Sequence, residues 1–238
     1  MENATYTTIT RQSGLMAEMR TIANNIANAS TTGYRAEGVV FAEHVARLDR
    51  DNASLSMATA SVRTTLQSQG ALSRTGGTFD LAIEGDGYFT LDTPDGLRLT
   101  RAGHFGPNEN GDLVNPDGHR LLDAGGAPVF VPQGTGAVGI AADGTISADG
   151  RPIGQIGLVR PTDPLAVTRG AGTVFDPGGG VEPAPDARMI QGFLEDSNVN
   201  PILQIGRMIE VQRAYDLGQS FLSQEDERIR GVIQTLQK

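Results

Sequence analysis

The chain has 238 residues, no cysteine or tryptophan, and a net charge of −9. This length suffices for one or two domains with a buried core, and the lack of cysteine excludes disulfides and thiol chemistry. No run of about 18 apolar residues is present, so we expect no helix that inserts into a membrane. Residues 1–6 lack the basic and apolar regions of a cleavable secretion signal, so any export should use a route that reads none.

The charge is unevenly distributed. Residues 1–35 carry +1, residues 201–238 are neutral, and the middle carries −10, from 11 Arg against 21 Asp and Glu. A nucleic-acid surface needs basic contacts to phosphates, so this acidic middle predicts no nucleic-acid partner. We interpret the acidic residues as a solvated surface.

The first predicted helix extends from about Thr5 to Ala29. Apolar residues at spacings of four and three form the narrow stripe of a coiled-coil seam. The predicted interface on this helix consists of Leu15, Met19, Ile22, Ile26 and the adjacent Asn25. A run rich in Asn, Ser and Thr follows and competes for backbone hydrogen bonds, and Gly33 can adopt the left-handed conformation that ends a helix.

Residues 36–78 have no single pattern, and we assign them to a connector. Residues 39–41 favour a short strand, whereas Val45 and Leu48 favour a helical turn. The Ala-, Ser- and Thr-rich stretch 52–69 predicts an extended segment.

From Phe79 the period changes to two, with Phe79, Leu81 and Ile83 alternating with polar neighbours, as Leu97 and Leu99 do. Turn sequences rich in Gly, Pro, Asp and Asn follow at residues 85–87, 93–96, 115–118, 125–126 and 143–144. Short alternating runs between such turns predict a mainly β module of hairpins over residues 79–192. Within it, residues 170–185 are rich in Gly and Pro and predict an exposed loop.

The last predicted helix occupies residues 201–238 and has the clearest boundary in the chain. Asn200 suits the N-cap, and Pro201 suits the first helical position, where its missing N–H costs nothing. Residues at coiled-coil spacing form the second part of the predicted interface: Met208, Val211, Tyr215, Leu222, Ile229, Val232 and Leu236. Gly218 and Glu225 interrupt the pattern, so we interpret it as a seam with defects.

These features predict an α+β fold. Residues 1–35 and 200–238 would pair as a coiled-coil-like helical domain around the β module, with 193–199 as a return linker. A seam this narrow buries little apolar surface, so its burial contributes less free energy than is lost in the conformational entropy of ordering both helices. We therefore expect the terminal helices to become ordered largely against neighbouring molecules.

The sequence contains no motif that predicts a catalytic or cofactor site. Residues 134–139 match G-x-G-x-x-G, but a strand pattern follows where a dinucleotide site needs a helix. His104, His119 and Asp117 lack regular metal-ligand spacing, and we interpret them as turn residues. Residues 108–112 resemble a calcium loop with a misplaced Gly, and we interpret them as a turn. We predict no enzyme activity, no cofactor and no metal, with a hydrolase lacking known motifs as a remote alternative.

Six segments resemble the signatures of flagellar rod and hook proteins. They are residues 23–28 (ANNIAN), 31–34 (TTGY), 80–89 (DLAIEGDGYF), 99–105 (LTRAGHF), 195–200 (EDSNVN) and 208–215 (MIEVQRAY). These segments occur in the family's order and, with the residues around them, the resemblance covers nearly the whole chain.

The resemblance implies a structural subunit of the bacterial flagellar basal-body rod. Such a subunit would leave the cytoplasm unfolded through the flagellar type III export apparatus and assemble helically in the periplasm. Its partners would be other copies of itself and neighbouring rod proteins, in the shaft that transmits torque from motor to hook. Alternatives that stay open are a distal-rod or hook subunit of the same family, and an adaptor whose β domain binds a separate ligand.

Overall fold

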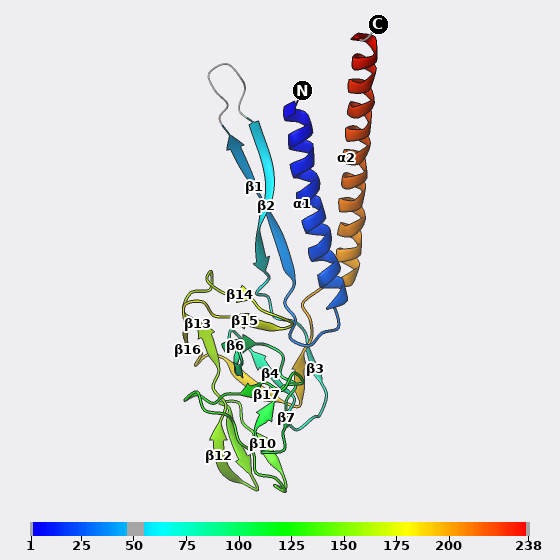
Figure 1. The fold of residues 1–238 in the computed structure, drawn as a ribbon. Coiled ribbons are helices and arrows are strands. Elements are labelled where there is room, and N and C mark those ends of the chain that lie inside the picture. Colours follow the sequence, from blue (N-terminus) through cyan, green and yellow to red (C-terminus); the bar gives the residue numbers. More distant parts are fainter. Residues whose placement is uncertain (1, 47–54, 237–238) are drawn as a thin grey trace. The chain divides into compact units, whose positions relative to one another are not determined.

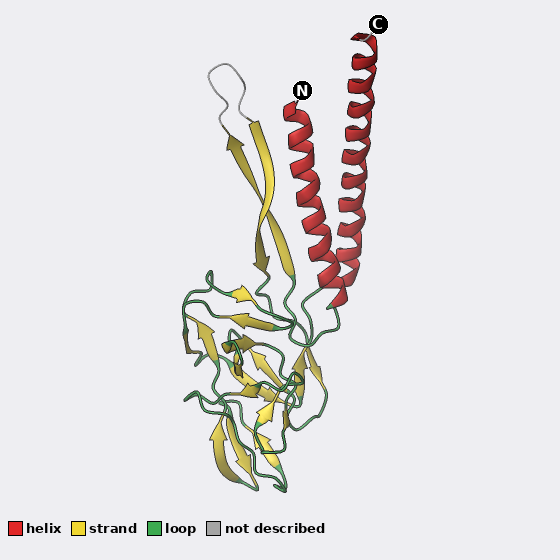
Figure 2. Cartoon of the chain, in the orientation of Figure 1, coloured by secondary structure: helices red, strands yellow, loops and turns green. Residues whose placement is uncertain are grey.

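The computed structural model describes residues 2–46 and 55–236, and has two helices from the ends of the chain and a mainly β middle (Figures 1 and 2). Helix α1 spans Glu2–Ala27 and helix α2 spans Pro201–Leu236. The two helices pack against each other. The predicted α+β class with paired terminal helices is confirmed.

Contacts divide the chain into two compact units. Unit 1 is drawn from Met1–Ala29, Ala36–Leu66 and Val199–Lys238, and unit 2 from Ser30–Arg35 and Gln67–Asn198. The chain thus passes between the units four times. The domain boundaries drawn from the sequence stay a prediction.

In unit 1 the predicted connector contains a long hairpin. Strand β1 (Glu37–Ala46) pairs antiparallel with β2 (Leu55–Thr65). Both strands are rich in the β-branched and aromatic residues that favour pleated structure. The strand predicted at residues 39–41 is confirmed as part of β1, and 55–65 is a paired strand rather than a free connector.

The helical turn predicted at Val45 is wrong, because Val45 pairs with Ser56 inside the hairpin. Leu48 lies outside the described residues. Helix α1 contacts both strands of the hairpin as well as α2, and it lies between them (Figure 1).

The helix ends follow the sequence signals closely. The side-chain Oδ1 of Asn200 accepts hydrogen bonds from the backbone N–H groups of Ile202 (3.1 Å) and Leu203 (3.2 Å), which confirms the N-cap. Helix α1 ends two residues before the predicted Ala29, where the side chain of Asn28 donates to the carbonyl of Asn24 (2.9 Å). This bond is the competition with the helix that Asn-rich runs predict.

Unit 2 is built from short strands. They are β3 (Leu72–Arg74), β4 (Leu81–Glu84), β5 (Phe89–Thr93), β6 (Gly96–Thr100), β7 (Gly106–Pro107), β8 (Leu113–Val114), β9 (Arg120–Leu121), β10 (Val138–Ile140), β11 (Thr145–Ala148), β12 (Arg151–Gln155), β13 (Val159–Pro161), β14 (Thr168–Arg169), β15 (Val174–Asp176), β16 (Val181–Pro183), β17 (Arg188–Gln191) and β18 (Phe193–Glu195). The largest sheet has the order β14-β15-β6-β5-β9-β8-β7, and β10-β11-β12 form a three-stranded sheet. The remaining strands form the pairs β13–β16, β17–β4 and β18–β3.

Three of the predicted turns lie between paired strands and are confirmed as hairpin turns, whereas residues 85–87 join β4 to β5, which do not pair with each other. Pro94 and Asp95 join β5 to β6, and Gly96 has the positive φ (95°) that a tight turn requires there. The turn between β8 and β9 closes with the N–H of Gly118 donating to the carbonyl of Asn115 (2.9 Å). Residues 143–144 likewise turn the chain between β10 and β11.

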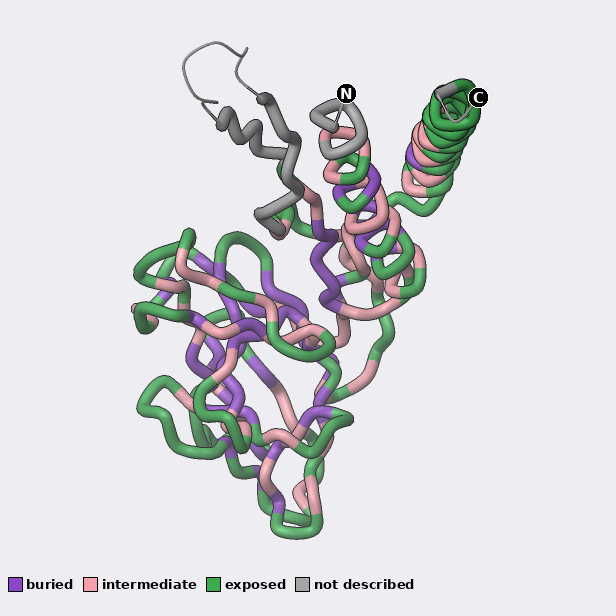
Figure 3. The backbone as a smooth tube through the Cα atoms, turned by 45° about the horizontal axis from the view of Figure 1, so that its top comes forward, coloured by how far each residue is buried: buried purple, intermediate pink, exposed green. Residues whose placement is uncertain are grey.

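An aliphatic core fills unit 2, and Figure 3 shows buried residues gathered there while much of α2 is exposed. Its fully buried members include Leu81, Phe89, Leu121 and Ile146. The alternation predicted around β4 is wrong in detail, because Ala82 is buried as well. Leu81, Ala82 and Ile83 are all buried, so both faces of β4 are covered over these residues, and only its last residue, Glu84, is exposed.

Two predicted irregular segments contain strands. Strands β15 and β16 lie within the predicted exposed loop 170–185, and Phe175 is buried with its ring edge-on to Tyr88 (centroids 6.0 Å apart). Strand β18 occupies the start of the predicted return linker 193–199 and pairs with β3. Composition suggested loops, but a few buried aromatic and aliphatic side chains hold these segments on the core.

Candidate functional site

The helix pair of unit 1 contains all the residues of the predicted interface. Three of them are buried: Ile22, Asn25 and Val211. Six are half-buried: Leu15, Met19, Ile26, Met208, Tyr215 and Leu222. Ile229 and Val232 are 43% and 50% exposed, and the side chain of Leu236 lies outside the description. The central part of both stripes is therefore covered within unit 1, where α1 contacts the hairpin as well as α2, and the end of the α2 stripe is not covered.

The interruption at Gly218 is a packing feature rather than a defect. The side chain of Gln12 on α1 donates from Nε2 to the main-chain carbonyl of Tyr215 on α2 (2.8 Å). A Cβ atom at Gly218 would lie 2.2 Å from the same Nε2. Gly218 therefore leaves room for an amide to reach the backbone of the facing helix, which fixes the register of the pair.

An ion pair joins the helices nearer the base of α2. Arg207 Nε lies 2.7 Å from Glu18 Oε1, and the Glu18 side chain is only 11% exposed. The hydrogen bond to Glu18 raises the pKa of Arg207. This pair was not predicted from the sequence, because no spacing rule relates single charges on two helices that are far apart in the chain.

Asn25 joins α1 to the hairpin. Its Nδ2 donates to the carbonyl of Glu37 (2.8 Å), and its Oδ1 accepts from the N–H of Glu37 (2.9 Å). A longer contact of 3.5 Å links Nδ2 to Gln204 Oε1 on α2. Asn25 thus acts inside unit 1, and a role toward another subunit stays a prediction.

Helix α2 exposes large apolar side chains along much of its length. They are Ile202 (81% exposed), Leu203 (68%), Ile205, Ile209, Leu217 (73%), Phe221, Ile229, Val232 and Ile233. Single exposed apolar residues are ordinary, but nine on one helix of 36 residues leave much apolar surface of this helix exposed, on several of its sides. We call these nine residues the apolar face of α2.

Two details of unit 1 extend this face. A groove of about 390 Å³ between the helices has apolar walls from Leu15, Leu217 and Phe221. Helix α2 has 36 residues against 26 in α1 and continues past the N-terminal end of α1 (Figure 1). The stripe residues Ile229 and Val232 belong to the last turns of α2, and both are exposed.

Unit 2 contains a buried charged group that the sequence analysis did not single out. Glu195 Oε1 lies 2.9 Å from Arg35 Nη2, and Glu195 Oε2 lies 2.8 Å from Arg101 Nε. The three side chains are 1%, 4% and 2% exposed, respectively. Burial lowers the pKa of Arg35, and the charge of Glu195 opposes this shift. We call Arg35, Arg101 and Glu195 the junction cluster.

Close backbone approach accompanies this cluster. Gly33 has φ of +68°, and a Cβ there would lie 2.3 Å from the backbone N of Ala102. The left-handed conformation predicted for Gly33 is confirmed, although it occurs six residues beyond the end of α1. Its use is contact with the segment that carries Arg101, rather than helix termination.

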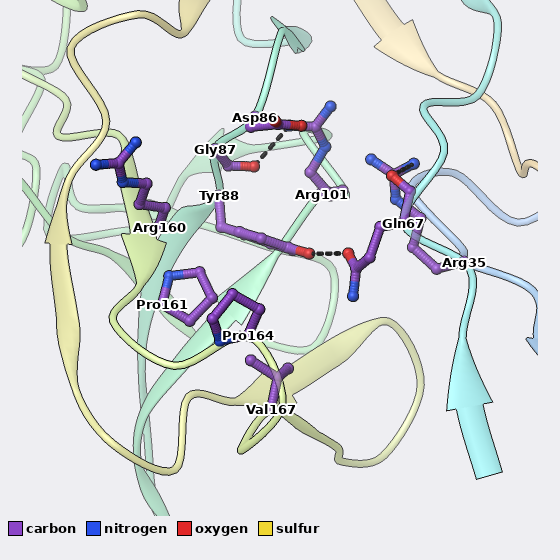
Figure 4. A pocket seen from close by; sticks show the side chains of 10 residues that line it. All are labelled: Arg35, Gln67, Asp86, Gly87, Tyr88, Arg101, Arg160, Pro161, Pro164 and Val167. Carbon is purple, nitrogen blue, oxygen red and sulfur yellow. Dashed lines mark hydrogen bonds between the residues drawn. The ribbon is translucent and has the colours of Figure 1, made fainter.

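A cavity of about 250 Å³ lies beside the junction cluster (Figure 4). Its walls include Tyr88, Pro161, Pro164 and Val167, and the Tyr88 hydroxyl donates to Gln67 Oε1 (2.7 Å). Burial raises the pKa of Tyr88. None of the ten described lining residues is His, Cys or Ser, so the cavity presents no nucleophile–base pair of the usual kind.

The remaining polar motifs are parts of turns and strands. The G-x-G-x-x-G pattern runs into β10, and a turn and another strand follow it. His104 Nδ1 lies 2.6 Å from Asp80 Oδ1, while the backbone of His119 donates to Asn115. In the calcium-like segment, Asn108 Oδ1 accepts from two backbone N–H groups of its own turn. Across the described residues searched, no three His, Cys, Asp or Glu side chains are grouped to hold a metal ion.

A helix pair with an uncovered apolar face, joined to a β-rich unit without recognisable catalytic groups, is the architecture of a subunit that assembles with others. Comparison with family models gives the class. Residues 6–35 match "Flagella basal body rod protein", 82–148 match "Flagellar hook protein FlgE/F/G D1 domain" and 190–235 match "Flagellar basal body rod FlgEFG protein C-terminal". The predicted resemblance to rod and hook proteins is confirmed.

Full-length relatives narrow the class. The chain is 38% identical to the flagellar basal-body rod protein FlgF of Mesorhizobium japonicum, over 99% of this chain and 98% of that protein. It is 35% identical to FlgF of Caulobacter vibrioides, over 100% and 99% of the two chains, and 28% identical to FlgG of Bacillus subtilis, over 98% of each. The chain belongs to the FlgF family of flagellar basal-body rod proteins, which are structural subunits of the rod. Neither helix, over the residues that can be described, is long and apolar enough to span a bilayer.

Proposed function

We propose that this subunit is exported unfolded by the flagellar type III apparatus and adds helically to the growing rod in the periplasm. It contacts other copies of itself and neighbouring rod proteins, and the assembled rod transmits torque from motor to hook. The observation that carries the proposal is the apolar face of α2, which is uncovered in the single chain.

The energetics of this face favour assembly. Full burial of a Leu, Ile or Phe side chain contributes about 1.5–3 kcal/mol relative to exposure. Several such residues at one contact give a drive comparable to that of ordinary protein interfaces, even after the entropic cost of association. The helices carry almost no net charge, so copies brought together along them do not repel.

We also propose that the subunit has no enzymatic role. The candidate motifs are occupied by turn hydrogen bonds, and the two buried guanidinium groups are neutralised in part by Glu195. The subunit then acts through its surfaces alone.

The test is the variant Leu217→Asp, with Gln212→Asp as the matched control. Both positions are exposed on α2, and both changes add one negative charge. The variants are expressed in a strain that lacks the gene for this subunit. We expect Leu217→Asp to abolish both its incorporation into basal bodies and the swimming of the cells, because a carboxylate cannot be buried there without a partner. Gln212→Asp should incorporate.

Leu217 suits this test better than the half-buried Ile26 or Leu222. A charge at either of these would also disturb the packing of α1 on α2. Normal incorporation of Leu217→Asp would remove the apolar face of α2 from the assembly contacts and contradict the proposal.

A further inference from the structure

The chain passes between units 1 and 2 through several segments. On the unit 2 side, each of these segments is bonded to the junction cluster or to another segment that is bonded to it. The passages occur after residues 29, 35, 66 and 198. Their unit 2 ends are residues 30–35, 67–70 and 195–198. We call these three stretches the crossing segments.

Backbone hydrogen bonds join the crossing segments directly. The N–H of Gly33 donates to the carbonyl of Glu195 (2.7 Å), and the N–H of Asn198 donates to the carbonyl of Tyr34 (3.2 Å). The side chain of Asn198 donates to the carbonyl of Ser68 (2.8 Å). The outgoing, returning and final passages are therefore bonded to one another.

The junction cluster extends this network into the sheet. Glu195 Oε1 accepts from the N–H of Gly70 (3.0 Å) as well as from Arg35, whose Nη1 donates to the carbonyl of Gln67 (3.1 Å) and to that of Ser68. Arg101 Nη1 donates to the carbonyls of Gly85 (2.9 Å) and Gly87 (2.6 Å), at the turn between β4 and β5. A single carboxylate thus links three crossing segments to the body of unit 2.

We infer that Arg35, Arg101 and Glu195 are positioning residues for torque transmission, which hold the crossing segments immobile on unit 2. This inference rests on the proposed function, because it needs the subunit to carry force inside the rod. The crossing segments are covalent connections between the two units, so sliding between these segments would let the subunit yield under force.

The chemistry of the cluster suits this role better than a role in stability alone. Buried ion pairs often stabilise a fold no more than apolar side chains of similar volume do. Charge-assisted hydrogen bonds are short and directional, however, and the planar guanidinium fixes its acceptors in a fork. Apolar packing would bury the junction without fixing the direction of each segment.

Amide hydrogen exchange on the full chain tests the immobilisation. The variant is Glu195→Gln, and the control is Ile146→Ala, a core change in unit 2 whose side chain makes no hydrogen bond to the crossing segments. We expect the amides of Gly33, Gly70 and Asn198 to lose protection together in Glu195→Gln. In Ile146→Ala they should keep their protection relative to the rest of unit 2. Independent loss, or no loss in Glu195→Gln, would overturn the inference.

Swimming under load tests the mechanical role. If Glu195→Gln fails to fold, the milder Arg35→Lys replaces it, since lysine keeps the charge but lacks the planar fork with which Arg35 bonds Glu195 and both carbonyls. We expect basal bodies to incorporate the junction variant, and cells to swim in dilute buffer but stop in viscous medium. Cells with an Ile146→Ala subunit of equal thermal stability should swim in both media.

The outcomes separate this inference from the proposed function. The inference is overturned if swimming in viscous medium depends only on the thermal stability of the variant, whether the change lies in the junction cluster or in the core. That result would leave the assembly proposal intact. Failure of Arg35→Lys to incorporate, beside normal incorporation of the core control, would also overturn it, since the cluster would then serve assembly. Normal incorporation of Leu217→Asp into basal bodies would instead contradict the proposed function.

Discussion

The register of the helix pair depends on Gly218. The structure determines whether replacing this glycine by alanine stabilises or destabilises the pair. Glycine in a helix interior costs about 1 kcal/mol relative to alanine, so Gly→Ala in α2 should stabilise where a methyl group fits. At Gly206 and Gly231 a Cβ would meet nothing within 4 Å. At Gly218 it would lie 2.2 Å from Gln12 Nε2.

Gly218→Ala should therefore displace the amide of Gln12 and break its bond to the Tyr215 carbonyl. Loss of a partly buried hydrogen bond costs about 1–3 kcal/mol. We expect Gly231→Ala to stabilise the pair by about 1 kcal/mol, and Gly218→Ala to fall about 1–3 kcal/mol below it. In a Gln12→Ala background the clash is gone, so Gly218→Ala should gain the same amount as the control.

Far-ultraviolet circular dichroism of the full chain during thermal unfolding measures these differences. A marginal helix pair responds to them strongly, because its ordered fraction changes steeply near balance. The role assigned to the Gln12–Tyr215 hydrogen bond would be refuted if Gly218→Ala and Gly231→Ala stabilised the chain equally. It would also be refuted if the effect of Gly218→Ala were the same with and without Gln12.

Two further predictions concern unit 2 and the hairpin. In unit 2, Gly103→Ala should destabilise by more than about 3 kcal/mol, because its Cβ would lie 1.6 Å from a carbonyl oxygen of β4; Gly106→Ala, with open space around its Cβ, serves as the control, and equal unfolding temperatures would contradict the prediction. In unit 1, Asn25→Ala should remove both bonds to the start of β1 and speed exchange of the first β1 amide roughly thirtyfold, the equivalent of about 2 kcal/mol. The exposed neighbour Asn24→Ala should leave that exchange unchanged, and the prediction is wrong if the two variants behave alike.

Sequence signals were sufficient where the physics is local. The N-cap at Asn200 and the proline after it define the start of α2 from two adjacent residues. The hairpin turn before Gly96 follows from the conformations that Pro, Asp and Gly prefer. Helical spacing likewise identified the buried stripe residues Ile22 and Val211.

Sequence signals failed where partners are distant in the chain. Glu195 and Arg101 have charges that suggest a solvated turn, and only the meeting of β18 with the segment after β6 buries them. Gly218 breaks a heptad, and the reason for a glycine there is the side chain of Gln12, about 200 positions away in the chain. No spacing rule relates such residues, because the contacts are set by tertiary packing.

The apolar face of α2 shows a third kind of limit. A heptad pattern selects residues at coiled-coil spacing, so it included Ile229 and Val232 but not Leu217 or Phe221. Leu217 and Phe221 lie outside this spacing, and only the structure shows that they are exposed beside the groove between the helices.

The most direct test of assembly through this face is chemical protection of single cysteines, since the native chain has none. Leu217→Cys is compared with Leu165→Cys, which lies in unit 2 at a side chain that is 95% exposed. The rate of maleimide labelling is measured in the free chain and in purified basal bodies. We predict that incorporation strongly slows labelling at position 217 and leaves position 165 reactive; equal labelling of position 217 in both states would contradict the account.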